Sequence, residues 1–147
     1  MQQARGIELP QDYLDFVATR NGDVELEVKL DPTDEDDVTF WRLFSENDLS
    51  QPVEMKGVGT VAAHNQLALY VKLFREVSGG DELPGIDTDI PSERVADGFV
   101  IGEDNGDLLY LDLHGDYSVW AFYHDGSYVE RVARSFSELM QRASEID

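Results

Sequence analysis

Residues 100–112 read VIGEDNGDLLYLD, two apolar runs on either side of a polar turn that contains Asn105-Gly106. An Asn-Gly pair between apolar runs is the strongest short-range signal of a β-hairpin, because both residues tolerate the positive φ angles of a tight turn. Two further apolar runs, Val119 to Tyr123 and Tyr128 to Val132, follow turn residues of the same kind: His114-Gly115-Asp116 and Asp125-Gly126. The last third of the chain is therefore predicted to be an antiparallel meander that starts near Phe99.

A helix is predicted on each side of this region of the chain. On the C-terminal side, Ser135 followed by Glu138 forms a capping box, and the apolar stripe behind it comprises Phe136, Leu139, Met140 and Ala143. Near the N-terminus, Pro10 suits a first helical turn. The apolar positions there recur at helical spacing before Asn21-Gly22 ends the pattern: Leu9, Tyr13, Phe16 and Val17.

The segment between these two helices is predicted to start with strands and to continue as helix and loop. Val24 to Leu30 alternates apolar and charged residues, as a half-buried strand does, and Val38 to Phe44 is its expected partner. The acidic run Asp31 to Asp37 between them suits a solvated loop. The later segments are predicted as a capping box at Ser45 and Asp48, a long helix over residues 60–77 and a long surface loop over residues 78–98. The order of elements predicts one α+β domain over residues 1–147, a mostly antiparallel sheet with flanking N-terminal, middle and C-terminal helices.

The charge of the chain restricts the kinds of partner it can bind. With 31 acidic and 11 basic residues, the formal net charge is -20. This potential repels nucleic acid and anionic lipid heads and attracts a basic partner, although acidity is equally compatible with a role in solubility alone. The chain has no cysteine, and neither a signal peptide nor a membrane span is recognisable, so we expect a cytoplasmic protein.

Three stretches of the sequence resemble hallmarks of the SUKH superfamily, also called the Smi/Knr-like family. They are Leu9 to Tyr13 with the Asn21-Gly22 ending, residues 100–112, and Val132 to Leu139. The resemblance implies an α+β domain that binds other proteins without catalysis, typically a bacterial immunity protein that neutralises a toxin encoded beside it. Other members act in eukaryotic cell-wall signalling or in viral counter-defence. Residues 41–94 align less clearly, and residues 78–98 are a candidate insertion in which partner choice could reside.

No pattern in the sequence predicts a catalytic, cofactor or metal site. The stretch Gly57 to Ala62 fits the dinucleotide-binding pattern G-x-G-x-x-A, but no buried strand precedes it, which favours a loop that leads into a helix. The acidic run Asp31 to Asp37 lacks the central glycine and terminal glutamate of a calcium loop, and the Glu103 to Asp107 turn is short. The three histidines are scattered, and no G-x-S-x-G is present. Hydrolysis by paired carboxylates stays open as an alternative, because among 31 acids some pair will lie close.

The leading hypothesis is an immunity protein that occludes a toxin, possibly a nuclease, through an acidic surface. The proposed partner-binding residues lie in the acidic loop, on the following strand and in the hairpin turn: Asp34, Glu35, Asp36, Asp37, Trp41, Glu103, Asp104 and Asp107. Aromatic residues such as Phe40 and Trp41 would anchor the interface where they are exposed. The alternatives are a regulatory or scaffold domain of the same fold and an acidic hydrolase.

Overall fold

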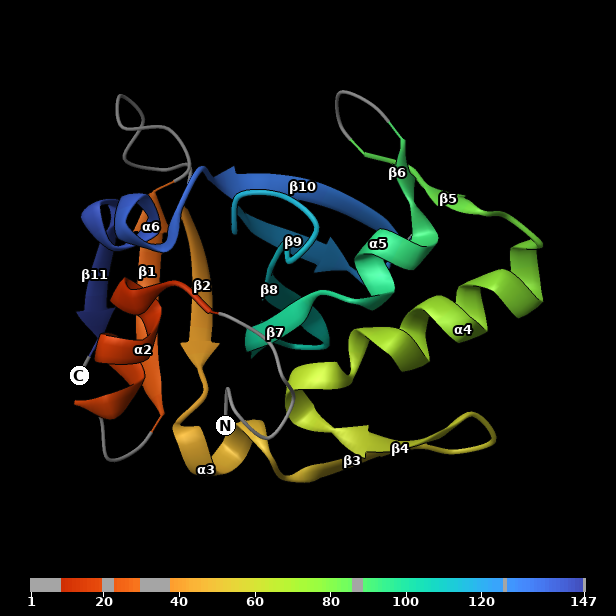
Figure 1. The fold of residues 1–147 in the computed structure, drawn as a ribbon, viewed down its shortest axis with the longest axis horizontal. Coiled ribbons are helices and arrows are strands. Elements are labelled where there is room, and N and C mark those ends of the chain that lie inside the picture. Colours follow the sequence, from red (N-terminus) through yellow and green to blue (C-terminus); the bar gives the residue numbers. More distant parts are fainter. Residues whose placement is uncertain (1–8, 20–22, 30–37, 86–88, 126, 147) are drawn as a thin grey trace.

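The protein is built on a seven-stranded antiparallel sheet with helices on both faces (Figure 1). The structure is a computed structural model, and it describes residues 9–19, 23–29, 38–85, 89–125 and 127–146. The strand order is β10-β9-β8-β7-β2-β1-β11. The bounds are β1 Val24–Lys29, β2 Val38–Leu43, β7 Phe99–Asp104, β8 Asp107–Leu111, β9 Val119–Tyr123, β10 Tyr128–Ala133 and β11 Ala143–Ile146. The predicted α+β class and the antiparallel sheet are confirmed.

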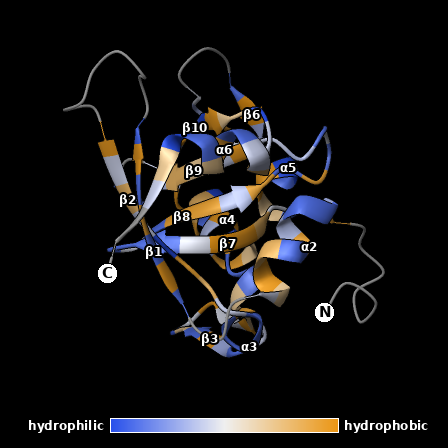
Figure 2. Cartoon of the chain, turned by 90° about the vertical axis from the view of Figure 1, so that its left-hand side faces the viewer, coloured by the Kyte–Doolittle hydropathy of each residue, from blue (hydrophilic) through white to orange (hydrophobic). Residues whose placement is uncertain are grey.

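The predicted meander forms strands β7 to β10. At the turn between β7 and β8, Asn105 has φ 49° and Gly106 has φ 95°, the pair of positive angles that a two-residue hairpin turn requires. The apolar residues of β7 and β8 are almost completely buried, and Figure 2 shows hydrophobic residues running along these two strands in the interior. The hairpin at residues 100–112 is thus the centre of the core.

Two helices cover one face of the sheet. They are α2, Gln11–Ala18, and α6, Phe136–Arg142. Tyr13 packs edge-on against Phe136 at 5.2 Å between ring centroids and against Phe99 of β7 at 6.2 Å. The predicted cap of α6 is present, because Ser135 Oγ accepts a hydrogen bond from the Glu138 backbone N–H. Both predicted terminal helices are confirmed, whereas Asn21-Gly22 lies outside the described residues.

The opposite face is covered by α4, Leu67–Ser78, and α5, Ser92–Ala96, but only over the meander. Tyr70 of α4 packs on Phe122 of β9 at 5.5 Å between centroids. Phe122 lies opposite Leu108, whereas Phe99 lies opposite Leu111. Since side chains alternate along a strand, Phe122 and Phe99 project from different faces of the sheet. The core therefore has two layers over β7 to β10.

The middle of the chain differs from the predicted long helix. Residues 60–62 belong to a hairpin of β3, Pro52–Met55, and β4, Gly59–Ala62, which is followed by a 3-10 helix, Ala63–Asn65. The G-x-G-x-x-A stretch is therefore a hairpin turn and a strand, not a loop that feeds a helix; its first glycine, Gly57, has φ 82°. At the other end of α4, Val77 is 80% exposed, because the last turn of the helix extends past the sheet.

Residues 78–98 were expected to form a surface loop, and this expectation was wrong. They contain β5, Glu82–Leu83, β6, Ile90–Pro91, and α5. Leu83, Ile90 and Val95 are buried in the core. The sequence did not reveal these elements because each is too short to establish a periodic pattern.

The C-terminal residues also depart from the prediction. Helix α6 ends at Arg142, and Ala143 begins β11, which pairs antiparallel with β1 and forms one edge of the sheet. Ala143 therefore belongs to a strand and not to the apolar stripe of the helix. A strand of four residues directly after a helix gives no alternating pattern long enough to recognise.

Candidate protein-binding site

One face of strands β1 and β2 is not covered by any described helix. The register places Glu25 beside Arg42 and Glu27 beside Phe40, all on the face opposite to the buried Leu26, Val28 and Trp41. Glu103 of β7 lies beside Arg42 on the same face. We call Glu25, Glu27, Phe40, Arg42 and Glu103 the open sheet face. Phe40 is 49% exposed, so this face presents a large apolar ring among charged side chains.

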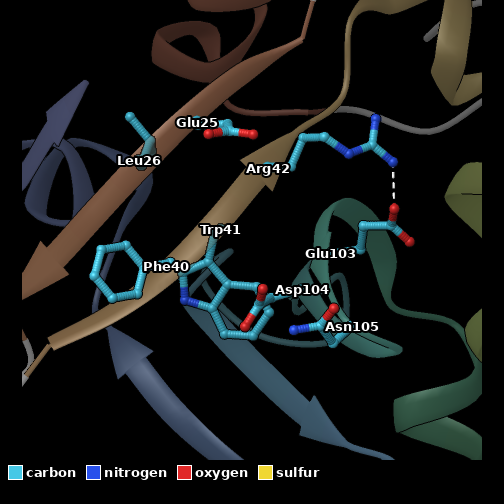
Figure 3. Close-up of a pocket in the computed structure, with 8 residues that line it drawn as sticks. All are labelled: Glu25, Leu26, Phe40, Trp41, Arg42, Glu103, Asp104 and Asn105. Carbon is cyan, nitrogen blue, oxygen red and sulfur yellow. Dashed lines mark hydrogen bonds and ion pairs between the residues drawn. The ribbon is translucent and has the colours of Figure 1, made fainter. Parts of the chain in front are cut away.

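A pocket opens where β2 separates from the β7–β8 hairpin (Figure 3). The two strands pair only at Arg42 with Glu103 and at Leu43 with Gly102, where a Cβ on Gly102 would lie 2.7 Å from the Arg42 carbonyl oxygen. Beyond this junction the strands diverge and leave a cavity of about 390 Å³. Its lining comprises Glu25, Leu26, Phe40, Trp41, Arg42, Glu103, Asp104 and Asn105.

Arg42 fixes one side of the pocket. Its guanidinium donates hydrogen bonds to the carboxylates of Asp23 and Glu103, and its central carbon lies 5.2 Å from the centroid of the Phe44 ring. The hydrogen bond to Glu103 is the main cause that raises the pKa of Arg42 above its ordinary value. The negative charge of Glu103 is therefore balanced by the guanidinium of Arg42. In the described part of the chain no ion pair neutralises Glu25 or Asp104.

The β7–β8 turn contains one carboxylate exposed to solvent and one that supports the turn. Burial, followed by the nearby charges of Asp107 and Glu103, raises the pKa of Asp104 above the ordinary aspartate value. Asp107 Oδ1 accepts a hydrogen bond from the His124 backbone N–H at 3.0 Å. The same oxygen lies 2.6 Å from His124 Nδ1. Asp107 thus ties the turn to the end of β9, while Asp104 stays available at the pocket.

The capping box expected at Ser45 is completed by a different residue. Ser45 Oγ accepts from the Asp48 backbone N–H at 3.2 Å, and α3, Glu46–Leu49, begins there. The Ser45 backbone N–H donates to Asp23 Oδ1 at 2.9 Å rather than to Asp48. Asp23 therefore links the start of β1 to the end of β2 and also binds Arg42.

The structure brings some of the predicted partner-binding residues together. Trp41, Glu103 and Asp104 line the pocket, whereas Asp107 does not. Asp34, Glu35, Asp36 and Asp37 lie outside the described residues. Trp41 is only 3% exposed and its Nε1 donates to Thr39 Oγ1, so it forms part of the core, and Phe40 is the exposed aromatic residue. Sequence reasoning missed Glu25, because only the strand register places it next to Arg42 and the hairpin turn.

Other kinds of site are not evident in the described part of the chain. It contains no group of three or more His, Asp or Glu side chains arranged to hold a metal ion. None of its helices has the length and apolar character needed to cross a membrane. His64 is buried and stacks on Phe99 at 4.9 Å between ring centroids, as part of the core.

Comparison with known proteins identifies a family but no individual relative. No curated protein and no solved structure matches the chain. The model of the SMI1 / KNR4 family (SUKH-1) matches residues 1–142, which include α2, the 100–112 hairpin and the whole of α6. This match covers nearly the whole chain and all three stretches that resembled the family. The chain therefore belongs to the SMI1 / KNR4 family (SUKH-1).

Proposed function

We propose that this protein is an immunity protein that neutralises a toxin with a basic surface by covering it with the open sheet face. The family to which the chain belongs includes immunity proteins. The observation that carries the proposal is the pocket beside the open sheet face: Glu25, the half-exposed Phe40 and Asp104 all line it, and neither carboxylate has an ion-pair partner among the described residues. An aromatic anchor surrounded by charges of one sign is a common arrangement in protein interfaces.

The chemistry of the pocket favours a cationic side chain of the partner. An arginine or lysine that enters the pocket can place its aliphatic stem against the aromatic lining and its charge near Glu25 or Asp104. The overall charge of -20 would speed the approach of such a partner. Nucleases are candidates because they hold phosphates with basic side chains. Binding would block access of the substrate, and the association rate would fall as salt is added.

The acidic residues beyond the pocket have different parts in this proposal. The loop residues Asp34, Glu35, Asp36 and Asp37 precede β2, and we propose that they add to the negative field at this edge. Asp107 supports the turn through His124, and Trp41 is buried on the other face of β2. Direct contacts are assigned to Glu25, Phe40 and Asp104.

The arrangement of carboxylates gives less support to a hydrolase. An acidic hydrolase needs two carboxyl groups that converge on one substrate bond. Glu103 and Asp104 are neighbours on a strand and point in different directions, and Glu103 is turned toward Arg42 (Figure 3). The pocket therefore fits the recognition of a cation better than acid–base catalysis.

The test is a growth assay with the products of the genes beside the one that encodes this protein. Each product is expressed in a sensitive host, alone and together with this protein. We expect one product to stop growth and this protein to restore it. The variant Glu25→Lys/Asp104→Lys should lose the protection. The matched control Glu54→Lys/Glu76→Lys changes the net charge by the same amount at exposed positions on β3 and α4, and should keep the protection.

Two outcomes would overturn parts of the proposal. If the Glu25 and Asp104 variant protects as well as the unchanged protein, the open sheet face does not bind the toxin. If no neighbouring product is toxic, the immunity role fails. A regulatory or scaffold domain of the same fold then becomes the better interpretation.

A further inference from the structure

A second pocket has the opposite charge to the pocket beside the open sheet face. It lies between β10 and α6, which follow each other in the chain, and has a volume of about 360 Å³. Its charged lining residues are Glu130, Arg131, Arg134, Glu138 and Arg142. Three guanidinium groups against two carboxylates make this lining positive, although acidic residues outnumber basic ones by 31 to 11 in the whole chain. The two pockets share no residue.

Glu138 of α6 holds two of the three arginines in place. Its Oε2 accepts a hydrogen bond from Arg134 Nε at 3.0 Å, and its Oε1 lies 3.1 Å from Arg142 Nη2. Arg142 Nη1 also donates to the Val132 carbonyl oxygen at 3.1 Å. Hydrogen bonds from the backbone N–H and the guanidinium of Arg134 lower the pKa of Glu138 below its ordinary value. This part of the pocket is therefore ordered before a ligand arrives, which reduces the entropic cost of binding.

The arginines also have donors that no described residue uses. A guanidinium carries five N–H donors in a fixed planar arrangement. Arg134 binds Glu138 through Nε alone, so its two terminal nitrogens have no partner in the part of the chain that the structure describes. The guanidinium of Arg131 has no hydrogen bond or ion pair with any described residue. Glu130 accepts a hydrogen bond from the Tyr123 hydroxyl at 3.4 Å instead.

We propose that this arginine pocket binds a phosphate group. A phosphate group presents three strong acceptor oxygens, and the three arginines belong to β10, to the turn after it and to the end of α6, so they can donate to different oxygens. Arginine suits phosphate recognition because its donors match pairs of oxygens. The cavity is in the size range of small-molecule sites, so it leaves room for the group that carries the phosphate. This inference does not depend on the proposed toxin binding.

The experiment is a titration of the isotope-labelled full chain with inorganic phosphate at neutral pH, followed by NMR of the arginine Nε–H groups. Sodium chloride at matched ionic strength is the control for screening. We expect phosphate, but not chloride, to give saturable shifts at Arg131 and Arg134. Arg131→Gln and Arg134→Gln should each raise the Kd for phosphate about tenfold, because each removes charge-assisted hydrogen bonds. The matched control Arg75→Gln removes the same charge at an exposed position on α4 and should leave the Kd unchanged.

Two phosphate esters distinguish the possible sources of the group. Tighter binding of an acetylated phosphoserine amide than of inorganic phosphate would assign the site to a phosphorylated side chain. Tighter binding of glycerol phosphate would assign it to a small phosphorylated molecule. Either result supports a phosphate site.

Three results would overturn the inference. Shifts that do not saturate would show that no phosphate site is present. A Kd that stays the same in Arg131→Gln and Arg134→Gln would place the phosphate elsewhere. An equal loss of affinity in Arg75→Gln would show that binding follows the net charge and not the pocket. Circular dichroism establishes that each variant is folded, which is expected because the replaced arginines are exposed.

Discussion

Phe40 and Trp41 are neighbours on β2, and replacing Trp41 by alanine should mainly lower stability, whereas replacing Phe40 by alanine should mainly weaken binding. Trp41 is 3% exposed, and truncating a buried aromatic side chain costs about 3–5 kcal/mol of the free energy of unfolding. Phe40 is 49% exposed and lies on an open face, so no cavity forms. Complete burial of a large apolar side chain contributes about 1.5–3 kcal/mol to stability, and the half-exposed Phe40 contributes about half of this. Phe40→Ala should therefore lower the free energy of unfolding by about 1 kcal/mol.

The effect of Phe40→Ala on binding should exceed its effect on stability. An aromatic residue at the centre of an interface contributes about 2 kcal/mol or more when truncated, which corresponds to a roughly 30-fold weaker Kd. Urea denaturation of both variants measures stability, and calorimetric titration with the toxin measures binding. The reasoning would be refuted if Phe40→Ala unfolded as easily as Trp41→Ala, or if it bound the toxin with unchanged Kd.

Three further predictions concern the charged groups. Arg42→Gln removes the ion pairs from β2 to Asp23 and Glu103, so it should lower the free energy of unfolding by about 1 kcal/mol. Because it also removes a positive charge, it should raise the association rate with a basic partner at low salt. Stopped-flow mixing measures this rate, and a slower association would contradict the expectation. The pKa of Asp104 is raised in the folded state, so the ionised carboxylate disfavours folding. At pH 7, Asp104→Asn should therefore raise the melting temperature, by an amount that corresponds to about 0.5 kcal/mol or less in the free energy of unfolding. This gain should vanish as the pH falls below the ordinary aspartate pKa, where both states of the unchanged protein are protonated, and a gain that grew toward low pH would have the wrong sign. Asp112 is 3% exposed, and its carboxylate accepts hydrogen bonds from Arg94 and from the His114 backbone N–H. In urea denaturation, Asp112→Ala should therefore lower the free energy of unfolding by about 3 kcal/mol, whereas Asp116→Ala on the same loop should lower it little. Equal effects would show that burial of the carboxylate is unimportant.

The parts of the fold that the sequence predicted are those with strong local signals. The Asn105-Gly106 turn requires positive φ angles, and Pro10 and Ser135 mark helix starts through their backbone geometry and hydrogen bonding. The elements that were missed are short strands with partners far away in the sequence. β11 exists because β1 presents a free edge, and nothing within residues 143–146 indicates this.

The candidate site was predictable only in part, for a similar reason. Alternation along β2 implies that Phe40 and Trp41 point to opposite faces, but which face is buried depends on where α2 and α6 pack. The pocket itself arises from the divergence of β2 and β7, which depends on the close approach at Gly102. The net charge and the polar turn predicted an acidic surface. That Glu25 belongs to this surface could be known only from the pairing register of β1 with β2.

The most direct test of the central claim is hydrogen exchange of this protein, free and bound to the toxin that it neutralises. We expect the complex to slow exchange at the open sheet face and the turn, in residues 24–29, 38–43 and 103–107, and to leave α2 and α6 unchanged. Protection confined to α2 and α6, or to α4, would place the toxin on another surface and contradict the account.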